Sequence, residues 1–275
     1  MSTIQSINRS LDVLEAFLTG PEVMGVTELA RTLGLSKSTL HGVLSTLEAR
    51  GYLKKDLAGK YSLGLKVFEL GNVAGERLDL PRLAGPALER LVSEHQETVH
   101  LTVLDRGEVV YIDKRESELS MRIVSQVGRR LPAHCTGVGK ILLAHISDEE
   151  LDRIIAEKGL PAMTQFTITD LEAFKRHLAN VRTCGYAIDD QEITEGLRCV
   201  AAPIRDRNGR VVAAISVAGP SVRMTDDKLQ RLTVSVPEAA REISERLGYG
   251  RGQVAPLRNN PDPATSADRA VKGCQ

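Results

Sequence analysis

The sequence predicts an α+β protein with two folded units, an N-terminal winged helix-turn-helix and a larger C-terminal α/β domain, joined by a connecting helix. Three observations lead to this class. The chain has 275 residues, which is enough to bury two separate cores. Apolar residues recur at helical spacing near the N-terminus, whereas strand-like runs flanked by helical segments follow from about residue 98. No stretch approaches the roughly 18 uncharged apolar residues that a membrane-spanning helix needs, so we expect no membrane partner.

An apolar stripe at the N-terminus indicates the first helix. The stripe has the spacing of one helix face and consists of Ile7, Leu11, Leu14 and Phe17. It ends before Gly20 and Pro21, a pair that terminates helices. The segment lacks the basic end and the apolar core of a secretory signal, so we expect the protein to stay in the cytoplasm.

Two further helices are predicted to follow, separated by a tight turn. Thr27 is a candidate cap for a short second helix, which Gly34 ends in the left-handed conformation. Ser36 is the candidate cap of a third helix that closes at Gly51. The predicted buried face of this third helix consists of Leu40, Val43, Leu44 and Leu47. Two helices joined so closely are typical of a helix-turn-helix.

The polar face of the third helix carries short side chains and one lysine. Small hydroxyl residues let a helix sit deep in the major groove of DNA, whereas a solvated face usually carries long Glu and Lys side chains. Two strands, at 52–55 and 60–63, follow as a wing whose lysines can contact phosphates. The predicted DNA-binding residues lie on these elements: Thr27, Ser36, Lys37, Ser38, Thr39, His41, Gly42, Ser45, Lys54, Lys55 and Lys60. The alternative is a winged helix that contacts only proteins.

The charge of this first unit is close to zero. Residues 1–64 contain seven basic and six acidic residues, and the whole chain has 36 of each kind. Because the affinity for DNA rises with the number of neutralised phosphates, one such unit is expected to bind weakly. The sequence therefore predicts that two copies bind together.

The rest of the chain divides into three predicted segments. Residues 65–80 are expected to form the connecting helix, residues 81–249 the second domain, and residues 250–275 a disordered tail rich in Pro, Asn, Gly and charge. In the second domain, strands are predicted at 98–104, 109–113, 121–126, 197–204 and 211–217. Helices are predicted at 83–96, 136–145, 148–157, 170–184 and 226–247.

Three segments together resemble the IclR family of bacterial transcription regulators. They are GLSKSTLHGVLSTLEARGYL in the helix-turn-helix, GRRLPAHCTGVGKILLA in the second domain, and GYAIDDQEITEGLRCVAAPIRDRNGRVVAAISVAGP near its end. The resemblance runs from about Ile4 to Leu247. It implies a GAF-like effector domain, a homodimer or dimer of dimers, palindromic operator DNA as partner, and repression more often than activation.

A small-molecule effector is expected to bind near the start of the helix at 136–145. Thr136 can cap this helix and leave backbone N–H groups beside small residues, an arrangement that favours an anion such as a carboxylate. The alternative is that these glycines only allow close packing on the sheet. The resemblance implies a pocket lined by Gly137, Val138, Asp189, Cys199 and Ser216. Because Ala218 stands where relatives can carry a second serine, we expect an organic or aromatic acid less polar than a small keto acid.

Other kinds of site are weighed against this effector pocket. Asp189 could instead be a solvated or capping carboxylate, and Cys199 a small buried apolar residue. Neither a metal nor a cofactor is expected, because His134 and Cys135 are adjacent and the four cysteines lack metal-ligand spacing. The nucleotide-loop and nucleophile-elbow patterns also fail, so we expect no enzyme. The alternative is an enzyme for a small molecule with an appended DNA-binding unit.

Overall fold

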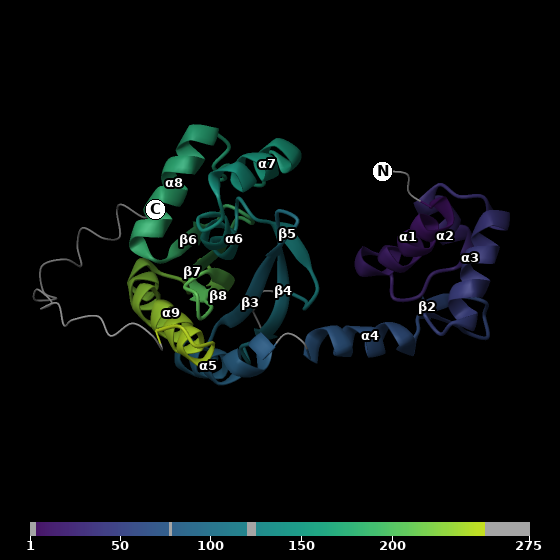
Figure 1. Ribbon diagram of the computed structural model, residues 1–275, viewed down its shortest axis with the longest axis horizontal. Coiled ribbons are helices and arrows are strands. Elements are labelled where there is room, and N and C mark those ends of the chain that lie inside the picture. The colour runs from purple at the N-terminus through teal and green to yellow at the C-terminus, as the bar shows by residue number, and fades with distance from the viewer. Residues whose placement is uncertain (1–3, 77–78, 120–124, 251–275) are drawn as a thin grey trace, which may run out of the picture. The chain divides into compact units, whose positions relative to one another are not determined.

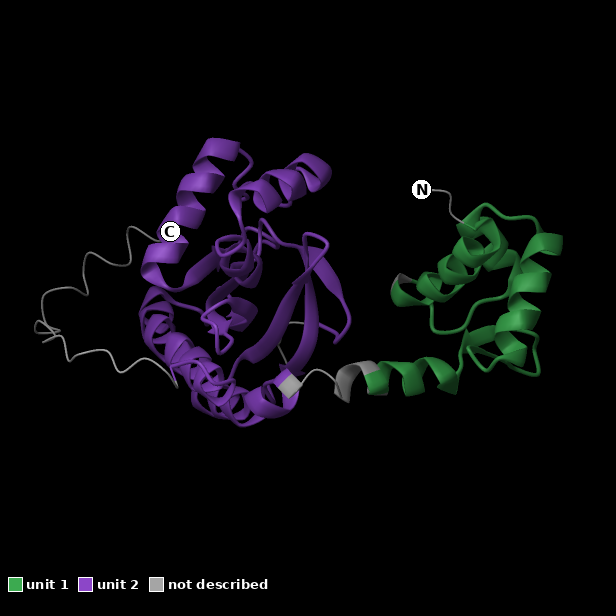
Figure 2. Cartoon of the chain, in the orientation of Figure 1, with its two compact units in different colours: residues 1–79 green, residues 80–275 purple. Residues whose placement is uncertain are grey.

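The computed structural model describes residues 4–76, 79–119 and 125–250. The chain divides into two compact units, residues 1–79 and residues 80–275 (Figure 2). Within the described residues, no helix is both long and apolar enough to cross a membrane. The tail predicted to be disordered lies, apart from Gly250, outside the described residues.

The first unit is a winged helix-turn-helix followed by one more helix (Figure 1). Its elements are α1 (Gln5–Thr19), α2 (Val26–Leu33), α3 (Lys37–Ala49), β1 (Leu53–Lys55), β2 (Tyr61–Leu63) and α4 (Leu65–Glu76). The two strands form an antiparallel hairpin. The core lies between the helices and the hairpin and includes Val13, Leu29, Leu40, Leu44 and Leu47. The predicted helix-turn-helix and wing are thus confirmed.

The turn between α2 and α3 explains the sharp angle of the motif. Gly34 has φ 63°, a left-handed conformation that favours glycine. Ser36 then caps α3, because its side chain accepts a hydrogen bond from the backbone N–H of Thr39 at 3.2 Å. The predicted cap at Thr27 is wrong: α2 begins at Val26 after Gly25, and Thr27 lies in the first turn. Val43, which we expected in the buried face of α3, is half-buried.

The second unit is built on a six-stranded antiparallel sheet with the order β5-β4-β3-β8-β7-β6. The strands are β3 (Thr98–Asp105), β4 (Glu108–Arg115), β5 (Arg130–Pro132), β6 (Ala187–Asp190), β7 (Leu197–Arg205) and β8 (Val211–Pro220). The helices are α5 (Asp79–His95), α6 (Gly137–Leu143), α7 (Asp148–Lys158), α8 (Leu171–Cys184) and α9 (Asp226–Arg246).

Helices cover both faces of this sheet (Figure 1). Successive side chains of a strand point to opposite faces of the sheet, so alternate residues pack into two separate hydrophobic cores. One core contains Val200 and Ile215 and packs against α5 and α9. The other contains Ala201 and Ala214 and packs against α6, α7 and α8. The small residues of this second face let α6 lie close to the sheet, where Cβ of a side chain at Gly137 would lie 3.4 Å from Cβ of Ala201 on β7.

Two sequence expectations for this unit need correction, and a third lies mostly outside the described residues. The short strands β5 and β6 were missed, because three and four residues with charged or proline side chains give little alternating pattern. Helix α5 begins at Asp79 rather than near 83, since Pro81 lies in its first turn, where a missing N–H costs nothing. Of the strand predicted at 121–126, residues 121–124 lie outside the described residues, and Ser125 and Gln126 belong to no strand.

Candidate functional site

The exposed face of α3 has a centre of small residues. Ser38, Gly42 and Ser45 recur at i, i+4 and i+7 and are all exposed. An added Cβ at Gly42 meets no atom within 4 Å, so packing inside the unit does not require glycine there. A glycine in a helix interior costs roughly 1 kcal/mol relative to alanine. The cost is explained if something outside the unit must approach the helix closely.

Polar and basic groups surround this centre. The hydroxyl groups of Ser38 and Thr39 both lie within 3.0 Å of the Ser36 hydroxyl at the start of α3. Lys37 and His41 are exposed along one edge, whereas Thr39 is half-buried on the side that faces α1. Such short donors and acceptors suit the base edges and phosphates of a DNA major groove.

The wing adds cations beside α3. Lys54, Lys55 and Lys60 are exposed, and the ammonium group of Lys55 lies 5.5 Å from the ring centre of Tyr61. The turn is fixed by Asp56, whose carboxylate accepts a hydrogen bond from the backbone N–H of Lys60 at 2.8 Å. Of the residues predicted to bind DNA, all but Thr39 are exposed, and all lie on α2, α3, the wing or the turns beside them. The structure thus brings them together on one small unit.

The second unit contains a cavity of about 240 Å³ on the α6 side of the sheet. Strand residues that pair across the sheet line it, Cys199 opposite Ala218 and Ser216 opposite His100. The lining residues are His100, Tyr111, Ser125, Arg129, Leu131, Pro132, Thr136, Val138, Met163, Asp189, Ile193, Thr194, Leu197, Cys199, Ser216 and Ala218. A cavity below the roughly 300 Å³ typical of drug-sized ligands indicates a small ligand, and apolar lining residues such as Leu131, Val138 and Met163 favour one with apolar surface.

Four of the five predicted effector residues line this cavity: Val138, Asp189, Cys199 and Ser216. Gly137 does not line it. An added Cβ at Gly137 would lie 2.7 Å from the sulfur of Cys199, so this glycine allows α6 to pack on β7. Thr136 caps α6 as expected, accepting a hydrogen bond from the backbone N–H of Gly139 at 3.2 Å. Its hydroxyl thus uses one of the N–H groups that we expected to face a ligand.

Several cavity residues were missed by the sequence analysis. His100, Tyr111 and Ser125 form a connected group: the His100 and Tyr111 rings stack with centroids 4.6 Å apart, and His100 Nε2 lies 2.8 Å from the Ser125 hydroxyl. The sequence signal for this group was a histidine beside the apolar residues Val99 and Leu101 of a predicted strand. The loop residues Ile193 and Thr194 offered no such signal, because only the folded loop brings them to the cavity.

Most titratable groups of the cavity are held neutral by burial. Burial lowers the pKa of His100 to about 4 and raises the pKa of Cys199 to about 12. Burial also raises the pKa of Asp189 to about 7, while the nearby Lys140 opposes the shift and Glu192 adds to it. Asp189 is 1% exposed, so it is not a solvated loop residue. Within the described residues, no group of three His, Cys, Asp or Glu side chains is arranged to hold a metal ion.

The family of the chain follows from comparison with known proteins. A family model described as the bacterial transcriptional regulator IclR C-terminal domain matches residues 73–245, and a model of the IclR helix-turn-helix domain matches residues 6–57. The chain belongs to the IclR family. It is a DNA-binding transcription regulator of this family with an effector domain for small molecules.

Individual relatives agree with this family over nearly the whole chain. The transcriptional regulator KdgR of Escherichia coli is 38% identical over 248 residues, covering 90% of this chain and 94% of KdgR. The transcriptional repressor IclR of the same species is 36% identical, with 90% of each chain covered. The crystal structure of an IclR homologue from Microbacterium hydrocarbonoxydans, complexed with 4-hydroxybenzoate, has a TM-score of 0.78 at 30% identity and covers 88% of this chain and 99% of its own.

Proposed function

We propose that this IclR-family chain is a repressor that binds palindromic operator DNA as a homodimer or dimer of dimers. We further propose that a small organic or aromatic acid binds the cavity of the second unit and changes operator affinity. The observation that carries the proposal is the cavity itself, lined by Val138, Asp189, Cys199 and Ser216. Two relatives are named as repressors, which supports repression rather than activation. Another relative is complexed with 4-hydroxybenzoate, which supports an aromatic acid as the ligand. We also propose a cytoplasmic location, because the operator DNA lies there.

The same cavity favours binding over catalysis. Cys199, Ser125 and Ser216 are its candidate nucleophiles, but burial raises the pKa of Cys199 to about 12, so the reactive thiolate is scarce at neutral pH. The Ser125 hydroxyl lies 2.8 Å from His100 Nε2, but burial lowers the pKa of His100 to about 4, so His100 is a weak general base at neutral pH. We therefore infer that the acid leaves the cavity unchanged and that the protein is not an enzyme.

A thermal-shift screen of organic and aromatic acids tests this proposal. An acid at 100 times its Kd stabilises the folded state by about 2.7 kcal/mol. For a unit of this size we expect the melting temperature to rise by about 5 to 10 °C. Ala218→Leu, which adds bulk to the cavity, should abolish the rise while leaving operator binding intact.

The proposal would be wrong if Ala218→Leu kept the full shift, because the acid would then bind elsewhere. Recovery of a chemically altered acid after incubation with the protein would favour the enzyme alternative. The variant's own melting temperature and its operator affinity are the controls for correct folding.

A further inference from the structure

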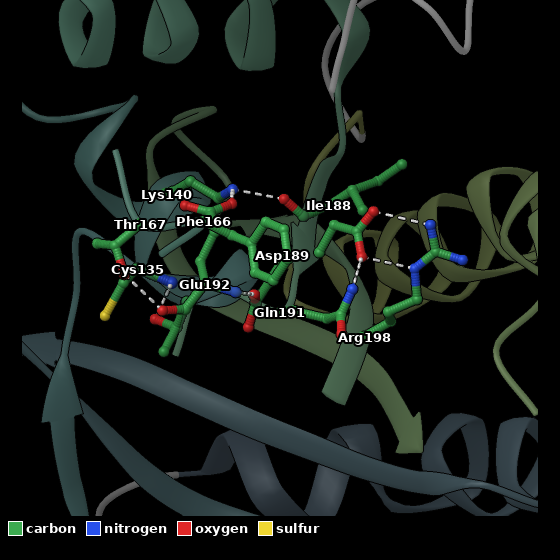
Figure 3. Close-up of polar contacts among 12 residues, drawn as sticks. Cys135, Lys140, Phe166, Thr167, Ile188, Asp189, Gln191, Glu192 and Arg198 are labelled. Atoms are coloured by element: carbon green, nitrogen blue, oxygen red, sulfur yellow. Dashed lines mark hydrogen bonds and ion pairs between the residues drawn. The ribbon is translucent and has the colours of Figure 1, made fainter. Parts of the chain in front are cut away.

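Asp189 carries the single carboxyl group among the described residues that line the cavity. It lies on β6 and is 1% exposed. One of its oxygens accepts a hydrogen bond from the backbone N–H of Glu192 at 2.8 Å (Figure 3). The carboxyl group therefore holds the start of the loop at 191–196 and at the same time lines the cavity. Its protonation state determines whether it can donate a hydrogen bond to that ligand.

The buried ammonium group near Asp189 is bound to other atoms. Lys140 lies on α6 and is 0% exposed, and its Nζ contacts a carboxylate oxygen of Glu192 and the carbonyl oxygen of Ile188. Glu192 is 6% exposed, and its carbonyl oxygen accepts a hydrogen bond from the Thr167 hydroxyl at 2.7 Å (Figure 3). The positive charge of Lys140 is thus neutralised by Glu192, and this pair contributes no net charge beside Asp189.

The other groups that face Asp189 are neutral near pH 7. They are Tyr111 on β4, Cys135 in the segment before α6, and Cys199 on β7, directly opposite Asp189 in the sheet. Burial raises the pKa of all three, to about 12 for both cysteines. His100, on β3, is also neutral, because burial lowers its pKa to about 4.

The charge of the enclosed site therefore depends on Asp189 itself. Arg129 also lines the cavity and partly offsets the rise in the pKa of Tyr111 that burial causes, so its charge acts on the site, but its side chain is exposed and solvent weakens that interaction. With Asp189 protonated, the buried groups sum to zero charge. With Asp189 ionised, they carry one negative charge in surroundings of low dielectric, and a ligand carboxylate would be repelled.

We propose that Asp189 is a neutral carboxylic acid when an acidic effector binds, and that its O–H donates a hydrogen bond to the carboxylate of the effector. Asp189 can stay neutral because Glu192, and not Asp189, forms the ion pair with Lys140. This inference rests on the proposed function. The proton comes from solvent, so binding of the anion at alkaline pH is accompanied by uptake of one proton. An O–H donor bound to a carboxylate makes a charge-assisted hydrogen bond, which is stronger than a neutral one. Glu192 is the positioning residue, since it acts on the ligand only through Lys140 and Asp189.

The first test is the pH dependence of affinity for 4-hydroxybenzoate, measured by calorimetry on the full chain. We expect the affinity to fall about 10-fold between pH 6 and pH 8, and about 10-fold for each further unit, as Asp189 loses its proton. Two buffers with different ionisation heats should report proton uptake approaching one per ligand at pH 8. The neutral analogue 4-hydroxybenzamide should bind with the same affinity throughout. An affinity for the acid that does not change over this range would overturn the proposal.

Three variants separate this account from a structural role. Asp189→Asn supplies an N–H donor that does not titrate, so the pH dependence of affinity should disappear. Glu192→Gln frees the charge of Lys140 to stabilise ionised Asp189, so affinity should begin to fall at least one pH unit lower. Glu195→Gln makes the same chemical change at an exposed position of the same loop and should leave the profile unchanged. A Glu192→Gln profile identical to the parent's contradicts the role assigned to Glu192.

Titration of the Asp189 carboxyl carbon by NMR, assigned with Asp189→Asn, tests the inference without any ligand. We expect a midpoint near neutral pH, and a midpoint below pH 5 would overturn the inference. If 4-hydroxybenzoate fails to bind at every pH, the ligand class in the proposed function is wrong. The carboxyl titration then decides the protonation state of Asp189 independently.

Discussion

Gly42→Glu is expected to weaken operator binding by about 100-fold or more while slightly stabilising the first unit. Gly42 lies at the centre of the exposed α3 face, and nothing lies within 4 Å of an added Cβ. A glutamate there would hold the helix away from the base edges and would repel phosphates. Each hydrogen-bonded pairing with a base that is lost in this way costs about 1 to 3 kcal/mol of binding free energy. Glutamate is also the better helix former, so the free energy of unfolding should rise by roughly half a kcal/mol. Fluorescence anisotropy with operator DNA and thermal unfolding measure the two effects.

The matched control for this variant is Gly71→Glu. Gly71 is an exposed glycine inside α4 of the same unit, and an added Cβ there also meets nothing within 4 Å. Its replacement should stabilise the helix similarly and leave operator affinity within a few-fold of the parent's. Normal operator binding by Gly42→Glu would remove α3 from the DNA interface.

The isolated segment 1–64 is expected to bind the operator at least about 100-fold more weakly than the full chain at the same salt concentration. The segment contains seven basic and six acidic residues, so one copy neutralises few phosphates. Linking two weak units commonly raises affinity by about 10² to 10⁴ without any new contact. The measurement is an anisotropy titration of both proteins with one operator, together with sedimentation analysis of their oligomeric state.

This second prediction depends on the segment being a folded monomer. Its helical circular dichroism and a cooperative thermal transition are the control. If a folded monomeric segment bound as tightly as the full chain, the inference that two copies share the operator would be wrong.

The architecture of the first unit could be predicted because its signals are local. Gly34 and Ser36 each determine the backbone of their own turn, and the stripe at Leu40, Leu44 and Leu47 requires one helix face to be buried. The cap of α2 was misplaced for the same reason: Thr27 is a good cap in isolation, but the helix starts at Val26. Sequence patterns determine helix existence better than they determine the first residue.

The cavity could be predicted only in part. Val138, Asp189, Cys199 and Ser216 were named from the family resemblance, and all four line the cavity. The pairing of Lys140 with Glu192 could not be inferred, because the two residues are 52 positions apart and meet only when α6 lies against β6. Gly137 was named from the same resemblance, but it does not line the cavity, and its close contact with Cys199 is a property of the packed sheet.

A ligand in the cavity of the second unit is expected to change the affinity of the first unit for DNA. The most direct test is the affinity of the most stabilising acid for the protein alone and for the protein saturated with operator. Linkage requires that the operator change ligand affinity by the same factor as the ligand changes operator affinity. With typical couplings of about 1 to 3 kcal/mol, we expect this factor to be roughly 5 to 150. Equal ligand affinities with and without operator would contradict the account.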